Sequence, residues 1–346
     1  AHAMAGERAD AWIGATTGYS DGWRDQSRTT SGRLAGNTGW RWSDRAETRV
    51  WLNINALNAE VPGTLSLADA LSNPRQTTPI GATNDYARDI RSVRTSVRHR
   101  VELDNGLGRG RVDVGGYYFQ KRLYHPVFQI VDQNGDFHGG FVRYVQAYTL
   151  FGLDAEWTLG AVWRDGRNDA RRFINERGLR GALTVDAVER ADQLTLYAEH
   201  RLAVTQRLVA IAGVQWLRAT RDFEDLLNPD NSDDIRYQRT SPSIGLIYAL
   251  REGVQWFANV SRSAEPASFS ELNQARPGET GFVPLALQRA WSAESGLRGG
   301  FGAWDWDLTV YHARLRGELL QFTTDQDIPA STFNADRTVH QGVEAG

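Results

Sequence analysis

Residues 193–204 read QLTLYAEHRLAV, and the polarity of their side chains alternates from one position to the next. One parity is apolar apart from His200, and the other is polar or amphipathic from Gln193 to Arg201. Successive side chains of a β-strand point to opposite faces of its sheet. The segment therefore predicts a strand with one apolar face and one polar face.

The same two-residue rhythm recurs along the whole chain. Trp304–Tyr311 repeats it with Trp, Trp, Leu and Val against Asp, Asp, Thr and Tyr, and Arg33–Trp42 and Glu47–Ala59 follow the same pattern. The polar face is too polar for a protein core, whereas the apolar face is too regular for a surface in water. A membrane β-barrel with a hydrated interior satisfies both demands. We therefore predict an all-β fold, an antiparallel transmembrane β-barrel with roughly fourteen strands of about 10–14 residues.

The connections between the predicted strands alternate between short and long. Thr205-Gln206 and Arg251-Glu252-Gly253 are short turns, whereas Val61–Asp89 and Leu123–Arg143 are expected to be long loops. Outer-membrane barrels alternate in this way, with short periplasmic turns and long extracellular loops. The pattern therefore predicts which end of the sheet faces the cell exterior.

One segment fits this scheme less well. Tyr144–Asn168 has to hold a descending strand, a turn and an ascending strand, but it offers only Leu159-Gly160 as a turn signal. We expect a very tight turn or a local deletion there, and the position of that turn stays open.

The composition excludes several classes of protein. The net charge of −3 and the pI near 6.2 provide no electrostatic footprint for nucleic acid. The sequence has no cysteine, which excludes structural disulfides and thiolate metal sites. It also has no run of about 18 apolar residues, which excludes a membrane-spanning helix.

No motif indicates catalysis or a resident metal. The seven histidines are scattered without HExxH spacing, and no GxSxG nucleophile elbow is present. Asp132–Asp136 resembles part of a calcium loop, but Phe141 stands where a glutamate is needed, so we interpret the segment as a polar hairpin tip. The acidic run Asp222–Asp234 predicts a solvated outer loop, with loose divalent-ion binding as the alternative. We predict no catalytic residue, no metal site and no enzyme, although an Asp/His site at the barrel mouth stays open.

Four later segments form an ordered set of motifs. Phe257–Leu272 reads FANVSRSAEPASFSEL, Gln288–Arg298 reads QRAWSAESGLR, Trp306–Tyr311 reads WDLTVY and Asn334–Glu344 reads NADRTVHQGVE. Their order and spacing resemble the barrel of TonB-dependent outer-membrane receptors. The earlier run Val61–Leu65, followed by Asn-Pro-Arg at 73–75, is similar to a loop of the ferric-siderophore and ferric-dicitrate members.

The resemblance implies that residues 1–346 form a partial receptor barrel in the bacterial outer membrane, which they cross many times. Family members carry a plug domain of roughly 100–150 residues, with the TonB box that the TonB complex grasps, and close with about 22 strands. Relative to that pattern the plug domain and about eight C-terminal strands are absent. We therefore expect a fragment that does not close a barrel by itself, and whose partnership with TonB depends on the missing plug.

The motifs also supply a set of signature residues, which we interpret as structural. Arginines and glutamates among them are expected to pair across strands on the hydrated side, because interior charges need partners. These residues are Ser261, Arg262, Glu265, Pro266, Arg289, Glu294, Arg337 and Glu344.

Ligand binding is expected on the side of the long loops. Anionic ferric chelates suit arginine forks and aromatic faces, and iron would arrive as chelated cargo and not as a cofactor. The alternative for each arginine is solvation or contact with outer-membrane lipid, including lipopolysaccharide phosphates. The candidates are Arg28, Arg75, Tyr124, Arg171 and Arg172.

The function predicted by this resemblance is TonB-coupled uptake of a ferric siderophore or a similar iron chelate. Two alternatives stay open, namely a passive porin-type channel and TonB-dependent uptake of a ligand without iron. A soluble β-repeat protein such as a propeller is disfavoured, because the sequence shows no repeat of about 40–45 residues.

Overall fold

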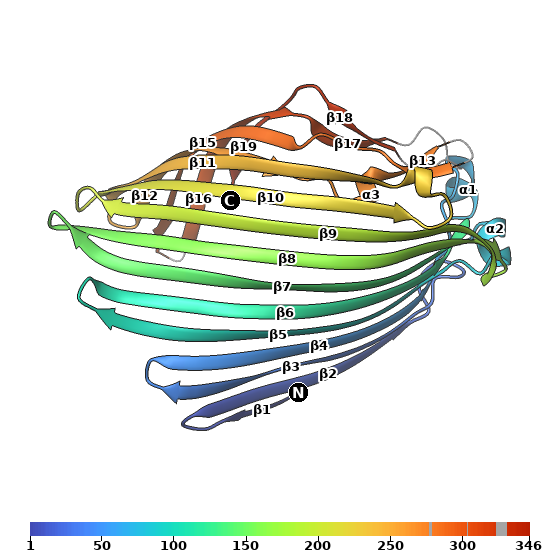
Figure 1. Ribbon diagram of the computed structural model, residues 1–346, viewed down its shortest axis with the longest axis horizontal. Helices are drawn as coiled ribbons and strands as arrows, with labels where there is room; N and C mark the ends of the chain where they lie inside the picture. Colours follow the sequence, from blue (N-terminus) through green and yellow to red (C-terminus); the bar gives the residue numbers. More distant parts are fainter. Residues whose placement is uncertain (277–278, 303, 323–330) are drawn as a thin grey trace.

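The computed structural model describes residues 1–276, 279–302, 304–322 and 331–346. Fifteen strands form one antiparallel sheet, and Figure 1 shows it curving so that its last strands lie behind the middle ones. The first and last strands of this order are its two edges, so the described residues form an open wall, a partial barrel. The strands are, in sheet order, β1 (His2–Ala5), β2 (Ala9–Ser20), β3 (Thr29–Ser43), β4 (Ala46–Glu60), β5 (Ala87–Asn105), β6 (Gly108–Pro126), β7 (Gln129–Leu150), β8 (Leu153–Glu176), β9 (Leu179–Ala203), β10 (Leu208–Asp225), β11 (Asp233–Arg251), β12 (Val254–Glu265), β15 (Gln288–Phe301), β16 (Trp304–Arg316) and β19 (Thr338–Ala345).

The two ends of the wall differ in their connections. At the turn end, on the left of Figure 1, short turns such as Asp44-Arg45 and Glu252-Gly253 join the strands. The opposite end, the loop end, carries all the helices of the described residues and the two small hairpins, and none of these helices is long and apolar enough to cross a bilayer. Its elements are α1 (Leu67–Ser72), α2 (Pro79–Thr83), the 3-10 helix η1 (Pro229–Asn231), α3 (Phe269–Leu272), the pair β13 (Asn273–Arg276) and β14 (Glu279–Phe282), and the pair β17 (Glu318–Phe322) and β18 (Ser331–Ala335).

The prediction of a long loop over Leu123–Arg143 is wrong. β6 continues to Pro126, and β7 begins at Gln129 after a two-residue turn. Asp132–Asp136, expected at a hairpin tip, lies inside β7, where it pairs with β6 and β8. Strands β7, β8 and β9 have 22, 24 and 25 residues, whereas about 9–11 residues cross a bilayer when tilted. These three strands therefore extend well beyond the thickness of a membrane.

The very tight turn expected within Tyr144–Asn168 is present, but at Phe151-Gly152. Leu159-Gly160 lies inside β8. Phe151 and Gly152 both have positive φ, 51° and 81°, as do Arg177 and Gly178 at the β8–β9 turn, 56° and 85°. Two-residue hairpins favour this backbone because its twist matches that of the strands. Glycine adopts this conformation at the second position of both turns without steric cost, whereas Phe151 and Arg177 adopt it at the first position, where non-glycine residues rarely do.

The two faces of the wall have opposite chemistry, as the sequence predicted. The apolar face, which we call the outward face, exposes its valines, leucines and isoleucines, and the register keeps them in rows, as at Val50↔Val97 and Ile244↔Val260. The inward face is polar, with ion pairs such as Arg49–Asp10 at 2.6 Å and Arg100–Asp113 at 2.7 Å. Exposed members of the outward rows include Val50, Leu52, Val97, Val114, Val142, Leu159, Leu196, Val214, Ile244, Val260, Leu308 and Val310.

One part of the inward face is apolar and buried. Near the loop end, side chains of β9–β11 pack against residues of the segment that connects β12 to β15. A capping box at α3, in which Glu271 accepts from the backbone N–H of Ser268 at 2.6 Å, starts the helix that enters this core. The core consists of Ala187, Ala219, Phe223, Tyr237, Ala267, Leu272, Phe282 and Leu285.

Candidate ligand-binding site

A pocket of about 220 Å³ lies on the inward face of β6–β9, next to α3. The strand register assembles it, because Lys121, Gly135, Asn168 and Glu189 stand opposite one another across four adjacent strands. The lining residues used below are Lys121, Gln133, Phe137, Asn168, Glu189 and Phe269 of α3.

Glu189 is a carboxylate buried beside this pocket, with an exposed fraction of 8%. The Nδ2 of Asn168 donates to its Oε2 at 2.7 Å, and the side chain of Asn273 in β13 donates to its Oε1. Arg172 also interacts with it electrostatically. A buried charge needs such partners, so Glu189 joins the wall to the connection that holds α3.

Phe137 lies flat on the strands at the side of the pocket. A Cβ at Gly166 would stand 2.4 Å from its Cδ1 atom, so the ring requires a glycine at this position. Its ring stacks on Phe119 with a centroid separation of 5.7 Å, and the guanidinium of Arg94 stands 4.5 Å from the Phe119 centroid. The inward wall therefore presents a cation and two aromatic rings in sequence, leading into the pocket.

Lys121 is the only lysine of the chain. Within the described ranges it forms no ion pair with a carboxylate, whereas the inward arginines Arg49 and Arg100 do. The pocket thus combines one ammonium group, two side-chain amides, the rings of Phe137 and Phe269 and the buried carboxylate of Glu189, whose charge is offset by Asn168, Asn273 and Arg172. Such a set of groups binds a small anionic or polar ligand by charge and stacking. In the described residues no cluster of His, Asp and Glu is arranged to hold a metal ion.

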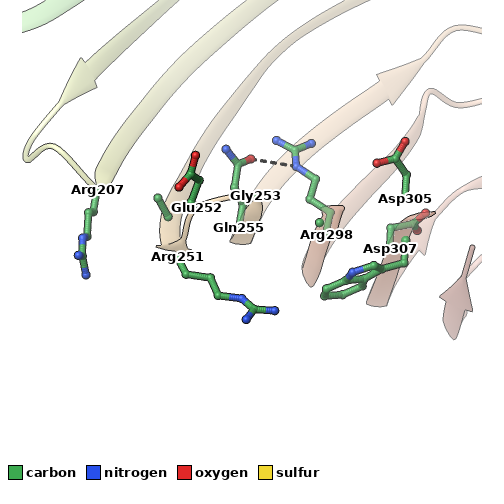
Figure 2. Close-up of a pocket in the computed structure, with 11 residues that line it drawn as sticks. Arg207, Arg251, Glu252, Gly253, Gln255, Arg298, Asp305 and Asp307 are labelled. Atoms are coloured by element: carbon green, nitrogen blue, oxygen red, sulfur yellow. Dashed lines mark hydrogen bonds between the residues drawn. The ribbon is translucent and has the colours of Figure 1, made fainter. Parts of the chain in front are cut away.

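A second pocket, of about 690 Å³, lies at the turn end between β11, β12, β15 and β16. Figure 2 shows Arg298 and Gln255 joined by a hydrogen bond of 3.2 Å from Nε to Oε1, while Arg207 and Arg251 extend away from them. Asp305 and Asp307 add negative charge on the other side. Charges of both signs are spread along this rim and do not converge, so the loop-end pocket is the better candidate.

Two predicted ligand residues act as ties between loops. Arg28 pairs with Glu60 at 2.6 Å, and this hydrogen bond raises the pKa of its guanidinium. Arg75 donates from Nε to the carbonyl oxygen of Trp23 at 3.1 Å. Arg24, which the sequence did not single out, donates to three carbonyl oxygens of the β4–β5 loop, those of Pro62, Gly63 and Gln76.

Two further candidates lie on the outward face near the loop end. Tyr124 donates its hydroxyl to the carbonyl oxygen of Gly178 at 2.7 Å, and Arg171 stands 3.6 Å from a carboxylate oxygen of Asp186. Arg172 points inward and interacts with Glu189, so it is the one candidate of the five that lies next to the pocket, although it does not line it. The ligand role of all five stays a prediction.

The pocket residues come from four strands and one helix far apart in the chain. Lys121, Phe137, Glu189 and Phe269 share no motif. The strand register brings the first three together, and α3 adds Phe269. In the sequence Lys121 differs from its surroundings only in being the single lysine of the chain.

A family model described as the β-barrel of TonB-dependent receptor-like proteins matches residues 10–346. The chain belongs to the TonB-dependent receptor family. Among solved structures, the unliganded ferric citrate transporter FecA is 15% identical with a TM-score of 0.82, and the match covers 99% of this chain and 51% of FecA. At this identity the likeness establishes the fold.

Two other solved structures have the same fold. The alcaligin outer-membrane receptor FauA from Bordetella pertussis is 16% identical with a TM-score of 0.69, over 98% of this chain and 53% of FauA. The ferric yersiniabactin uptake receptor FyuA from Yersinia pestis is 12% identical with a TM-score of 0.73, and the match covers 98% of this chain and 53% of FyuA. This TonB-dependent receptor chain therefore spans about half the length of each structure it matches.

The signature residues of this receptor barrel do not pair as expected. Arg262 and Arg289 point outward, whereas Glu265 and Glu294 point inward, because residues an odd number of positions apart lie on opposite faces. Arg262 stacks on Trp291 at 5.5 Å, and Gln288 donates to Glu265 at 3.0 Å. The prediction of cross-strand Arg–Glu pairs among these residues is therefore wrong.

The other signature residues of the receptor lie at different heights along the last strands. Ser261 faces inward opposite Ser292, Pro266 follows directly after the end of β12, and Glu344 stands opposite Thr309. The side chain of Glu294 accepts a hydrogen bond from Asn259. Arg337, expected to face the interior, instead lines a groove with outward arginines.

Proposed function

We propose that this chain forms part of the wall of an outer-membrane receptor that takes up a ferric chelate by TonB-coupled transport. The family match over residues 10–346 is the observation that carries the proposal. The exposed apolar outward face fits lipid, and the polar inward face fits a hydrated interior. The structures it resembles include transporters and receptors whose names refer to ferric citrate and ferric yersiniabactin.

The inward pocket, of about 220 Å³, offers contacts to part of an anionic chelate. The ammonium group of Lys121 attracts carboxylate or phenolate oxygens, and the rings of Phe137 and Phe269 offer flat apolar surface to the body of the chelator. Iron in such a ligand is held by the chelator, so the pocket needs no metal ligands of its own. The TonB complex is the partner that would supply the energy for transport.

The decisive experiment deletes the gene in its source bacterium and measures uptake of radioactive iron from ferric citrate, a ferric catecholate and a ferric hydroxamate. We expect loss of uptake from one of them, restored by the full-length gene and abolished when the proton-motive force is dissipated. Unchanged uptake of all iron chelates would point to a ligand without iron. Uptake that persists without the proton-motive force would indicate a passive channel.

A point variant tests the pocket itself. A hydrogen bond to a charged group contributes about 1.5–3 kcal/mol, so Lys121→Gln should raise the half-saturating chelate concentration by roughly 10- to 100-fold. The matched control is Arg33→Gln, which removes an inward cation on β3 whose Nη2 donates to Asn53 at 3.3 Å. Equal half-saturating concentrations for the two variants would show that Lys121 does not contact the ligand.

A further inference from the structure

Five arginines form a cluster on the outward face at the loop end of the last strands. The register places Arg262, Trp291 and Arg314 side by side across β12, β15 and β16. One step farther from the turn end, Arg289 stands opposite Arg316, and Arg337 precedes β19. These residues line a groove of about 460 Å³, which we call the arginine groove.

The arginine groove is positively charged because its cations have no acidic partner in the described part of the chain. None of the ion pairs there includes Arg262, Arg289, Arg314, Arg316 or Arg337. Arg262 stacks on Trp291 at 5.5 Å, and Arg314 donates from Nε to the Nε2 of His312 at 3.1 Å. Like charges directly opposite each other, as at Arg289 and Arg316, destabilise a sheet unless an anion lies between them.

Some outward arginines elsewhere at the loop end have acidic partners, whereas Arg91 and Arg122 stand opposite each other across β5 and β6 with no ion pair in the described part of the chain. Arg190 in β9 pairs with Asp222 at 2.9 Å and with Glu224 at 2.8 Å on β10. Arg180 pairs with Asp132 at 2.6 Å. The outward face can therefore supply carboxylates to arginines, and the described residues of β12–β19 supply none to the five arginines of the groove.

The arginine groove lies at the upper border of the apolar belt. On β16, outward Trp304 stands at the turn end, Leu308 and Val310 follow, and Arg314 comes ten residues after Trp304. Ten residues of a strand tilted by about 40° rise by about 25 Å, which is the height of the apolar band of outer-membrane barrels. Arg314 thus stands at the level where lipid headgroups begin, and Trp291 beside it is the residue type favoured at that boundary.

We propose that the arginine groove binds the phosphate groups of a phosphorylated lipid of the outer leaflet, the lipopolysaccharide class. Guanidinium groups form bidentate hydrogen bonds with phosphate, and five of them match a headgroup that bears more than one phosphate. The acyl chains of that lipid would lie on Val310 and the other apolar side chains below the groove. This inference rests on the outer-membrane placement proposed above and is independent of the cargo.

The test measures lipid retention by the full-length receptor purified in detergent. Native mass spectrometry with added lipopolysaccharide should show a bound lipid for the wild type. The triple variant Arg262→Gln/Arg314→Gln/Arg316→Gln should lower its affinity at least 10-fold, and the single variant Arg316→Gln should lower it less. The control Arg190→Gln removes an outward arginine that already has partners and should bind as the wild type does.

Two competitor arms separate the sources of phosphate. Lipopolysaccharide with its phosphates removed should bind at least 10-fold more weakly, and millimolar inorganic phosphate should not displace the intact lipid. Equal binding of the dephosphorylated lipid, or full displacement by inorganic phosphate, would overturn the proposal. A receptor that binds the lipid but whose deletion leaves uptake of every iron chelate unchanged would count against the transport proposal alone. A heat-shift on gel electrophoresis confirms that each variant is folded.

Discussion

The outward and inward faces of β10 show how one strand serves two different surroundings. Outward Val214 is 44% exposed and lies among exposed valines and isoleucines, whereas inward Gln215 lies on a face with ion pairs and amides. Exposure alone therefore does not distinguish the faces. What distinguishes them is which groups are exposed, and this difference is the physical basis for placing lipid on one side and water on the other.

The largest loss of stability is expected in the part of the inward face that is apolar and buried. Leu272 of α3 is fully buried against the apolar patch of β9–β11. Leu272→Ala should destabilise this core by about 2–5 kcal/mol, because a large-to-small substitution loses burial and leaves a cavity. Chymotrypsin cleavage between β12 and β15 would then be much faster. Leu67→Ala in α1, at a side chain 77% exposed, is the control that should change nothing.

The next effect tests the outward face directly. Val214→Arg should destabilise the folded wall by about 2–4 kcal/mol in phospholipid vesicles, because charge near the bilayer midplane is poorly solvated. Gln215→Arg, one position along and facing inward, should lie within about 1 kcal/mol of the wild type. Urea titrations of the full-length receptor in vesicles measure both. Equal effects of the two substitutions would show that the outward face does not meet lipid.

The comparison of faces also explains what the sequence revealed. Within the bilayer the two surroundings differ, so β4 alternates clearly and was predicted to within one residue at each end, whereas β9 was recognised only from Gln193 onward and in fact begins at Leu179. Beyond the bilayer both faces meet water, and the alternation fades although the ladder continues. This is why the long strand β7 looked like a loop around Asp132–Asp136.

The candidate site was less accessible to sequence reasoning than the fold. The pocket depends on which residues stand opposite one another, and a shift of one residue moves a side chain to the other face. Arg262 illustrates the point, because its parity with Val260 predicts an outward side chain, whereas the family motif suggested an interior pair. Residues such as Lys121 and Glu189 are joined by register over long sequence distances, which no local pattern encodes.

A smaller effect is expected from a single hydrogen bond in the inward core. The hydroxyl of Tyr237 donates to the carbonyl oxygen of Leu285 at 2.9 Å in a buried position. Tyr237→Phe should destabilise the core by about 1 kcal/mol, because the carbonyl loses its partner without access to water. Tyr197→Phe, on the same face of β9 toward the turn end, should have little effect. Protease sensitivity and urea unfolding together measure the difference between the two variants.

The smallest effect is expected at the outward rim, where charge meets water above the lipid. Arg190 bridges Asp222 and Glu224, but its side chain is 44% exposed. Arg190→Gln should change stability by less than about 1 kcal/mol, because exposed ion pairs are screened and their side chains lose entropy. That difference should vanish near 1 M salt, where the Debye length is about 3 Å, while the effect of Val214→Arg should persist. If Arg190→Gln changed stability as much as Val214→Arg does, and the change persisted at high salt, the placement of Arg190 in water would be contradicted.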